Sequence, residues 1–351
     1  MSTLASLLSP RRAAGPAHTK RWAPPRRAIA VCALLSIVVS AVCVVALGTG
    51  DIALSPTEVV SALLGGGERT DRIVVLEWRL PRVLAAVAFG AALAVGGAVF
   101  QSLTRNPLAG PDILGLSAGS HTGALIVIIV LAGGYAEVAA GALLGGLLTA
   151  ALVYMFSLRA GLQGFRLIVV GVSLAATLSA INTWMLLRAE LDVAMTAAAW
   201  GAGSLGTVAW RQVVPAVVAI AVLLAALRLL IPLLRHLELG DDAARALGLP
   251  VERAKLALVA VGVALIAVVT AAAGPIAFVA LAAPHIARLL LRGPALQMTA
   301  TALTGSLMLT IADHVAQHAL PTPLPAGIAT VVIGGGYLVW LLLHETRRTR
   351  S

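Results

Sequence analysis

Continuous apolar runs about as long as a membrane is thick are the feature that most constrains this chain. A helix crosses the hydrocarbon core of a bilayer with about 20 residues, and about ten runs of that length follow one another along the sequence. The runs are continuous rather than alternating, which favours helices over the strands of a membrane barrel. The predicted spans are 28–48, 82–104, 113–132, 138–157, 167–187, 213–234, 256–272, 274–290, 296–313 and 326–343.

The amount of apolar side chain supports the same conclusion. Of the 351 residues, 60% are hydrophobic and 11% are charged. A water-soluble core could not bury so much apolar surface, so we expect lipid to solvate most of the chain.

Basic residues are distributed unevenly between the two sides that these spans define. If the N-terminus lies in the cytoplasm, the inner segments hold 19 of the 25 Lys and Arg residues and the outer segments hold the other 6. This excess follows the positive-inside rule, which predicts that both termini are cytoplasmic. The net charge of +10 then reflects topology, and we expect no nucleic-acid partner.

One membrane domain, residues 28–344, is expected between two short basic tails. Residues 1–27, rich in Pro, Ala and Arg, are predicted to form a disordered cytoplasmic tail, and residues 345–351 a second one. In the outer segment after the first span, Ser55-Pro56-Thr57-Glu58 has the composition of a capping box. It predicts a short helix from Val59 to Leu64 on the outer surface.

Motifs that would give the chain its own chemistry are missing from the sequence. It contains no G-x-x-x-x-G-K-[ST] loop for nucleotide phosphates and no H-E-x-x-H metalloprotease motif. We therefore expect no catalytic residues and no cofactor, with any ATP hydrolysis on another chain. Residues 200–206 match G-x-G-x-x-G but lack a strand–helix–strand context, which favours a tight turn over a dinucleotide site.

Two histidines come nearest to a metal site. His314 and His318 are four residues apart beside Asp313, a spacing that suits a metal pair. Asp313, however, projects about 100° around the helix from His314. Hydrogen bonding at the outer rim or contact with a partner is favoured over ligation, and we predict no metal site. A shortage of buried ligands fits a bulky chelate, whose metal is already wrapped, better than a bare ion.

The segment Arg79–Ser120 carries a long ordered pattern. Two arginines flank Leu80-Pro81, an apolar run follows, Asn106-Pro107-Leu108 breaks the helix, and a glycine-spaced run begins at Gly115. This pattern resembles the signature of the FecCD-type permeases, the membrane subunits of ABC importers for ferric siderophores, haem and vitamin B12. Pro284-His285 lies in a second matching segment, where the resemblance favours a structural histidine at the inner end of a span.

Residues 235–255 form the longest predicted inner loop, and its centre has the features of a short helix. Paired carboxylates suit a helix N-terminus, and a glycine followed by a proline ends the helix. The pattern resembles the coupling helix of the family, which docks on the ATPase subunit and transmits its movement. The residues expected to take part are Gly240, Asp241, Asp242, Ala244, Arg245, Leu247 and Gly248.

Arg79 and Arg82 are predicted on the outer face, just before the second span. Guanidinium groups bind carboxylates bidentately. The resemblance implies that these arginines dock a substrate-binding protein, together with a third basic residue. That third position is Gln317 here, with His318 beside it, so we expect an incomplete docking patch. Simple placement of arginine at the membrane interface stays open as an alternative.

Small and polar residues inside the spans are predicted to join helices. Gln101 and Asn182 are expected to hydrogen-bond between helices rather than to contact a substrate. Two glycine series with a spacing of four should let helix backbones approach closely in lipid. They are Gly115, Gly119 and Gly123, and Gly141 and Gly145.

The resemblance and the spans together predict an all-α, multi-pass protein of the cell membrane with a FecCD/BtuC-like permease fold. The implied partners are a second permease chain, two ATP-binding subunits inside and an extracytoplasmic substrate-binding protein outside. Ferric siderophore is the expected substrate, with vitamin B12 and haem as alternatives. A homodimer and a heterodimer both stay open, and Gln317 favours the heterodimer. The rival class, an ion-driven secondary transporter, would need a buried ionisable couple near the membrane midplane.

Overall fold

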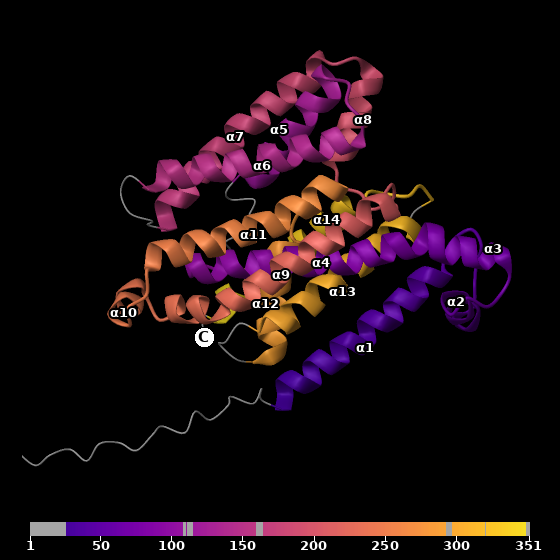
Figure 1. The fold of residues 1–351 in the computed structure, drawn as a ribbon, viewed down its shortest axis with the longest axis horizontal. Coiled ribbons are helices and arrows are strands. Elements are labelled where there is room, and N and C mark those ends of the chain that lie inside the picture. Colours follow the sequence, from indigo (N-terminus) through magenta and orange to yellow (C-terminus); the bar gives the residue numbers. More distant parts are fainter. Residues whose placement is uncertain are drawn as a thin grey trace, which may run out of the picture.

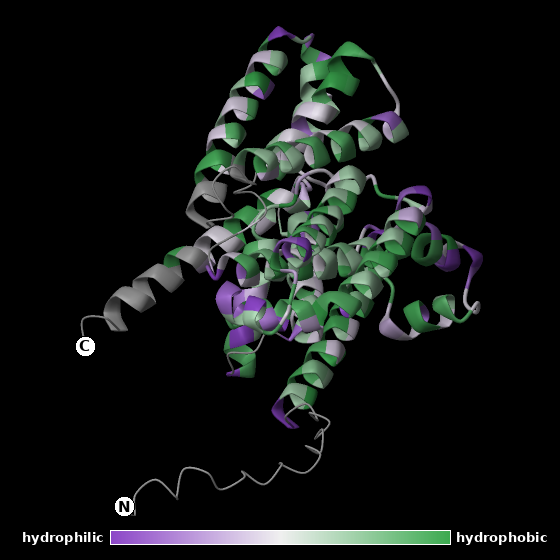
Figure 2. Cartoon of the chain, turned by 60° about the vertical axis from the view of Figure 1, so that its left-hand side comes forward, coloured by the Kyte–Doolittle hydropathy of each residue, from purple (hydrophilic) through white to green (hydrophobic). Residues whose placement is uncertain are grey.

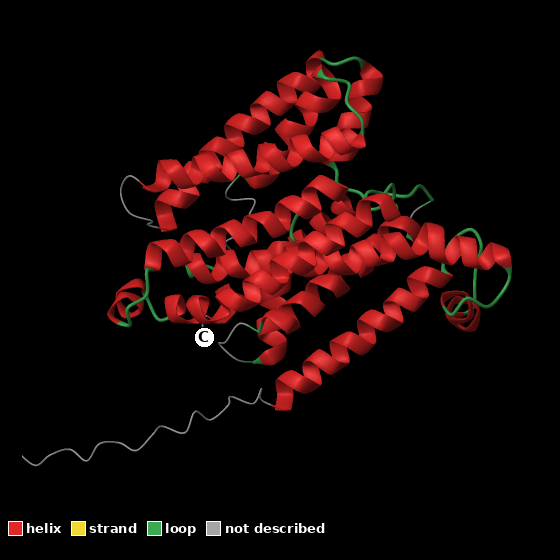
Figure 3. Ribbon diagram, in the orientation of Figure 1, coloured by secondary structure: helices red, strands yellow, loops and turns green. Residues whose placement is uncertain are grey.

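The computed structural model is a bundle of long helices with their ends at two opposite sides (Figure 1). It describes residues 26–107, 110, 115–158, 164–292, 297–319 and 321–348. Every regular element in this part of the chain is a helix (Figure 3). Most of the predicted N-terminal tail and Leu108 lie outside the described residues.

Long helices coincide with the predicted spans. They are α1 (Arg26–Gly48), α4 (Leu80–Thr104), α5 (Leu116–Leu125) with the π-helical extension Ile126–Val130, α6 (Tyr135–Leu158), α7 (Gly164–Arg188), α9 (Trp210–Glu238), α11 (Val251–Ala273), α12 (Val279–Leu291), α13 (Met298–His318) and α14 (Ala326–Arg348). Shorter helices connect them: α2 (Pro56–Leu63), α3 (Arg69–Arg72) with the π-helical segment Ile73–Arg79 that leads into α4, α8 (Leu191–Gly201) and α10 (Asp241–Ala246).

Several of these helices are long and apolar enough to cross a membrane. Six meet both conditions, and three shorter apolar segments accompany them. The six are Arg26–Gly48, Arg69–Thr104, Tyr135–Phe156, Val169–Arg188, Trp210–Glu238 and Val251–Ala273, and the shorter ones are Leu116–Val130, Val279–Leu291 and Ala326–Tyr337. The chain is therefore an all-α, multi-pass membrane protein, while the full count of ten spans stays a prediction. Hydrophobic residues run along the helices, and hydrophilic residues gather at the helix ends and connections (Figure 2).

The central helix of the bundle is α4. Its most apolar window is 78% buried, whereas the corresponding windows of α1, α7 and α9 are 17% buried. Helices α1, α9, α11, α12 and α13 all pack against α4 (Figure 1). Helices α5 to α8 form a separate group along one side, which contacts the rest mainly through α6 and α11. We call the side of the bundle that carries α2 and α3 the α2 end, and the opposite side the α10 end (Figure 1).

Close helix contacts confirm the predicted role of the spaced glycines. A Cβ atom on Gly119 or Gly145 would collide with the other helix of the α5–α6 pair, and the same holds for Gly123 and Gly141. The two backbones approach so closely because neither carries a side chain there. Gly115 begins α5 with a φ of 69° and packs against Ala175 of α7.

Buried polar groups also bridge helices as predicted. Gln101 Nε2 on α4 donates a hydrogen bond to the Leu281 carbonyl of α12 at 2.9 Å, and Gln101 Oε1 accepts from Arg288 Nη2 at 2.7 Å. Asn182 on α7 donates to the Ala118 carbonyl at 3.2 Å and accepts from the Thr122 hydroxyl at 2.7 Å. Each side chain thus uses its amide to join neighbouring helices.

The capping box before α2 is present as predicted. The Ser55 amide and hydroxyl donate to Glu58 Oε2 at 2.7 and 2.8 Å, and the Glu58 amide donates back to the Ser55 hydroxyl at 3.3 Å. These bonds to the carboxylate lower the pKa of Glu58 below its ordinary value.

The segment between α7 and α9 contains more structure than the sequence indicated. Only the tight turn at residues 200–206 was expected here, and the structure adds α8 over Leu191–Gly201 before it. The glycine-rich turn itself follows α8 as predicted. Gly203 has a φ of 68° there, and its carbonyl accepts a hydrogen bond from the Gly327 amide at 2.9 Å.

Helix α12, which corresponds to the eighth predicted span, begins later than predicted. The sequence placed the start of this span at residue 274, and α12 begins at Val279. Gly274 ends α11 with a φ of 74°, and Phe278 precedes α12 with a φ of 66°. These two left-handed residues hold residues 274–278 outside a helix, a backbone geometry that an apolar run does not reveal.

Candidate functional site

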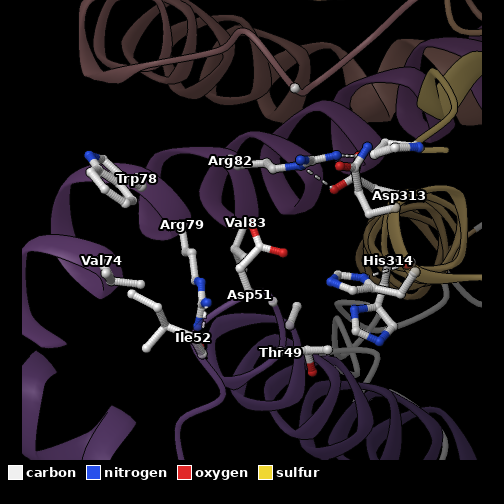
Figure 4. Close-up of a pocket in the computed structure, with 16 residues that line it drawn as sticks. Thr49, Asp51, Ile52, Val74, Trp78, Arg79, Arg82, Val83, Asp313 and His314 are labelled. Atoms are coloured by element: carbon white, nitrogen blue, oxygen red, sulfur yellow. Dashed lines mark hydrogen bonds and ion pairs between the residues drawn. The ribbon is translucent and has the colours of Figure 1, made fainter. Parts of the chain in front are cut away.

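A cavity of about 810 Å³ opens at the α2 end between the C-terminus of α1, the start of α4 and the end of α13 (Figure 4). It brings together the four residues that the sequence suggested for docking, although they lie far apart in the chain. Its polar lining consists of Thr49, Asp51, Arg79, Arg82, Asp313, His314, Gln317 and His318.

Arg82 is held by an ion pair inside the chain. Its Nε and Nη2 atoms donate to Asp313 Oδ2 and Oδ1, both at 2.8 Å, so the fork of the guanidinium meets both carboxylate oxygens (Figure 4). The side chains are 20% and 10% exposed, respectively. Bidentate pairing of this kind is both strong and geometrically specific. The pair joins α4 to α13 at the α2 end.

Arg79 is also engaged within the chain. Its Nη1 donates to the Leu47 carbonyl at 2.8 Å and its Nη2 donates to the Ile52 carbonyl at 2.6 Å. The Leu47 carbonyl is one of the groups that the end of α1 leaves without an intrahelical partner. The guanidinium packs over Gly50, where a Cβ atom would lie 2.5 Å from Nη2. Arg79 therefore fastens the end of α1 and the following loop to α4.

Gln317 stands at the position where the resemblance implied an arginine, and its side chain is hydrogen-bonded within the chain. Its Nε2 donates to the Leu324 carbonyl at 3.3 Å, which ties the end of α13 to the connection that leads into α14. The proposed docking role of Arg79, Arg82, Gln317 and His318 stays a prediction. The structure shows that all four already have hydrogen-bond partners within the chain.

The two histidines on α13 stack at the rim of the same cavity. The ring centroids of His314 and His318 are 4.7 Å apart, and His318 Nδ1 lies 3.0 Å from the His314 carbonyl oxygen. Among the described residues, no group of three or more His, Cys, Asp or Glu side chains is arranged to hold a metal ion.

At the α10 end, the predicted inner loop folds into the short helix α10. Gly240 and Gly248 flank it with φ values of 116° and 82°, which fits the glycines at both ends of the sequence pattern. Asp241, its first residue, makes two ion pairs. Lys255 Nζ on α11 lies 2.5 Å from Asp241 Oδ2, and Arg105 Nη2 lies 3.3 Å from Oδ1.

The Asp241 anchor connects three long helices. Arg105 ends α4 in a left-handed conformation, and its Nη2 also donates to the Leu237 carbonyl of α9 at 3.2 Å. Asp241 therefore links α10 to α4, α9 and α11 through two cations. Sequence reasoning named Asp241 as a helix-start residue, and it missed both partners because they come from other helices.

The opposite side of α10 faces outward. Asp242 and Arg245 form an exposed pair at 3.1 Å, and Leu247 is 62% exposed just after the helix. Ala244 is fully buried against the bundle. The residues of the predicted coupling helix thus divide into an anchored side and a free surface that contains an apolar residue.

The other predicted motif residues lie at helix ends or between helices. The Asn106 amide donates to the Gln101 carbonyl at 3.2 Å where α4 ends, and Pro107 follows. Pro284 is buried within α12, and next to it His285 Nδ1 lies 2.9 Å from the Tyr337 hydroxyl of α14. These positions fit the structural role expected for His285.

A sequence profile of the FecCD transport family matches residues 36–344. The chain belongs to the FecCD transport family. Among its relatives, the ferric enterobactin transport system permease protein FepG of Escherichia coli K12 is 45% identical over 328 residues, which cover 92% of this chain and 98% of that protein. The vitamin B12 import system permease protein BtuC of Vibrio cholerae is 34% identical over 308 residues, covering 87% and 91%.

The fold of this FecCD protein also matches a solved structure. A metal-chelate type ABC transporter in an inward-facing conformation superimposes with a TM-score of 0.81 and 27% sequence identity. The match covers 90% of this chain and 99% of that one. The predicted FecCD-type permease fold is therefore confirmed, and the chain is a multi-pass permease of the ABC transporter class.

Proposed function

We propose that this FecCD permease carries ferric siderophores across the inner membrane, driven by ATP hydrolysis on partner subunits. The observation that carries this assignment is the 45% identity to the ferric enterobactin permease along almost the whole of both chains. The vitamin B12 permease is also a full-length relative, at 34% identity. Vitamin B12 and haem are therefore the alternative substrates.

Helix α10 supports coupling to an ATPase subunit at the cytoplasmic side. Its exposed side offers Asp242, Arg245 and Leu247 for docking, and its anchored side meets the ends of α4, α9 and α11. A displacement of α10 by the ATPase subunit would be transmitted to these helices through Asp241, because charge-assisted hydrogen bonds are strong and directional. These contacts support the coupling role inferred from the sequence.

The α2-end cavity supports docking of an extracytoplasmic substrate-binding protein. It is the place where the predicted docking residues converge, and Arg82 lines it with its guanidinium directed at Asp313 (Figure 4). Two permease chains with two ATPase subunits would complete the importer. Apolar side chains on α7, such as Trp184 and Leu187, are exposed and could contact lipid or a second permease chain.

The substrate assignment is tested by uptake in a strain that lacks this chain. Iron-labelled ferric siderophores, haem and labelled cobalamin are supplied separately, with and without the chain restored. We expect that restoring the chain restores uptake of a ferric siderophore and does not restore uptake of haem or cobalamin. Restoration of haem or cobalamin uptake would replace the substrate assignment. Transport in vesicles that contain no ATPase partner would overturn the ABC mechanism.

The coupling role is tested by charge reversal on the exposed side of α10. Arg245→Glu should reduce co-purification of the ATPase subunit and lower transport. Arg253→Glu makes the same charge change at an exposed position in the first turn of α11 and serves as the matched control. Normal ATPase yield and full transport with Arg245→Glu would contradict the coupling role.

A further inference from the structure

The α2-end cavity already contains the carboxylate that Arg82 would need from a partner. Asp313 accepts from Nε and Nη2 of the Arg82 guanidinium, both at 2.8 Å, and its side chain is 10% exposed. A carboxylate arriving from outside would meet an arginine whose charge is already paired and whose Nε–Nη2 edge is filled, with only the Nη1 side left to bind it. A docking carboxylate and Asp313 therefore compete for the same guanidinium.

The charged lining of the cavity is balanced. Arg79 and Arg82 line it together with Asp51 and Asp313 (Figure 4). Arg79 is fastened to two backbone carbonyls, so its position is set by the end of α1 rather than by a carboxylate. Of the two arginines, Arg82 is thus the one whose carboxylate partner could be exchanged for a carboxylate of another protein.

Arg82 and Asp313 also hold two long helices together. They join α4 and α13 near the cavity, and the Ser306 hydroxyl of α13 donates to the Val87 carbonyl of α4 at 2.7 Å further along the same seam. Beyond it the helices touch at Gly90 and Gly305. If Arg82 were released from Asp313, α4 and α13 could separate at the α2 end, while the glycine contact would keep the two helices together deeper in the bundle.

We infer that Asp313 is an internal competitor for the docking partner, so that the Arg82–Asp313 pair acts as a latch between α4 and α13. A carboxylate of the binding protein opens the latch by taking over the guanidinium of Arg82. Docking is then linked to loosening of α4 against α13, and an undocked permease keeps its α2 end closed. This inference rests on the proposed docking role of the cavity.

The test measures the affinity of the cognate binding protein for the permease–ATPase complex in lipid nanodiscs. Asp313→Asn should tighten binding by about tenfold, because a bidentate charged competitor is removed. Asp51→Asn makes the same charge change in the same cavity without touching the Arg82 fork, and we expect a much smaller gain. Equal gains from both substitutions, or no gain from Asp313→Asn, would overturn the latch.

A third variant separates failure of the latch from failure of the docking role. Arg82→Gln should abolish tight binding, and adding Asp313→Asn to it should restore nothing. Unchanged binding by Arg82→Gln would refute docking at Arg82 itself. Lost binding with Arg82→Gln, but no gain with Asp313→Asn, would refute the latch alone.

A measurement with the ion pair intact covers the case in which Asp313→Asn fails to fold. Spin labels at Trp78 and Val315, both exposed, report the separation of the segment leading into α4 and the end of α13. The native Cys32 and Cys43 are replaced by serine in this protein. We expect the distance to increase when the binding protein docks. An unchanged distance would overturn the latch.

Discussion

The contact between Gly90 on α4 and Gly305 on α13 offers a sharp test of how the bundle is held. A Cβ atom added to Gly90 would collide with the Gly305 carbonyl and would lie 2.9 Å from the Ser306 Cα. Carbon atoms prefer separations of about 3.5–4.0 Å, so Gly90→Ala should push the helices apart by roughly 1 Å. Excess volume in a packed core costs about 1–3 kcal/mol.

A matched control isolates the packing effect from helix propensity. Alanine favours a helix over glycine by about 1 kcal/mol, which offsets part of the packing cost. The overlap is with backbone atoms that cannot rotate away, which places the packing cost at its upper end of about 3 kcal/mol, so Gly90→Ala should destabilise by about 2 kcal/mol. Gly336 on α14 has open space around it, because no other atom lies within 4 Å of a built Cβ atom. Gly336→Ala should therefore be neutral or slightly stabilising.

The assay is thermal unfolding of the purified permease in detergent. A loss of about 2 kcal/mol should lower the Tm of Gly90→Ala by about 4–8 °C, since larger domains shift by about 2–4 °C per kcal/mol. Two results would refute the reasoning. One is a Tm for Gly90→Ala equal to that of the wild type, and the other is an equal loss in Gly336→Ala.

Three further predictions concern polar contacts. Asp241→Asn should leave the ATPase subunit bound but reduce substrate uptake per ATP hydrolysed, because α10 loses its ion pairs to the bundle; unchanged coupling in proteoliposomes would contradict this. The carboxylate of Glu58 accepts two hydrogen bonds from Ser55, so its folded-state pKa lies below the unfolded one. Its stabilisation of α2 is present above the ordinary pKa of glutamate and is lost as the pH falls through the folded value. The protection factors of the α2 amides, which are corrected for the intrinsic exchange rate at each pH, should therefore fall on acidification in the wild type and not in Glu58→Gln. Gln101→Met should destabilise by about 1–3 kcal/mol in thermal unfolding, because Arg288 loses an acceptor in the bundle interior.

The positions of the helices could be predicted well from the sequence, for a reason specific to lipid. A segment surrounded by hydrocarbon must satisfy its backbone hydrogen bonds internally, so each long apolar run becomes a helix whatever its neighbours do. The capping box at Ser55 was equally visible, because all of its partners lie within four residues. Helix α8 was not predicted because its 11 residues are too few for a span and acidic residues, Glu190 and Asp192, stand at its start.

The candidate sites were predicted only in part. Their residues were found from the resemblance and from loop composition, and Arg79, Arg82, Gln317 and His318 do meet in one cavity. What each of them touches could not be predicted. Gln317 was expected to leave a gap in a charged patch, which stays a prediction, and its bond to a backbone carbonyl seven residues away could not be foreseen.

From its sequence alone, this protein is determined as a multi-pass helical membrane protein, because apolar length and helix-end signals act locally along the chain. Its resemblance to the FecCD-type permeases lies in the ordered pattern of Arg79–Ser120. Tertiary structure alone decided that Arg82 is paired with Asp313, 231 residues away, and that Asp241 is held by cations from α4 and α11. The period of a helix sets which residues share a face. Which faces meet depends on how the helices cross, and here the small residues of α4 and α13 allow the approach that brings Arg82 to Asp313.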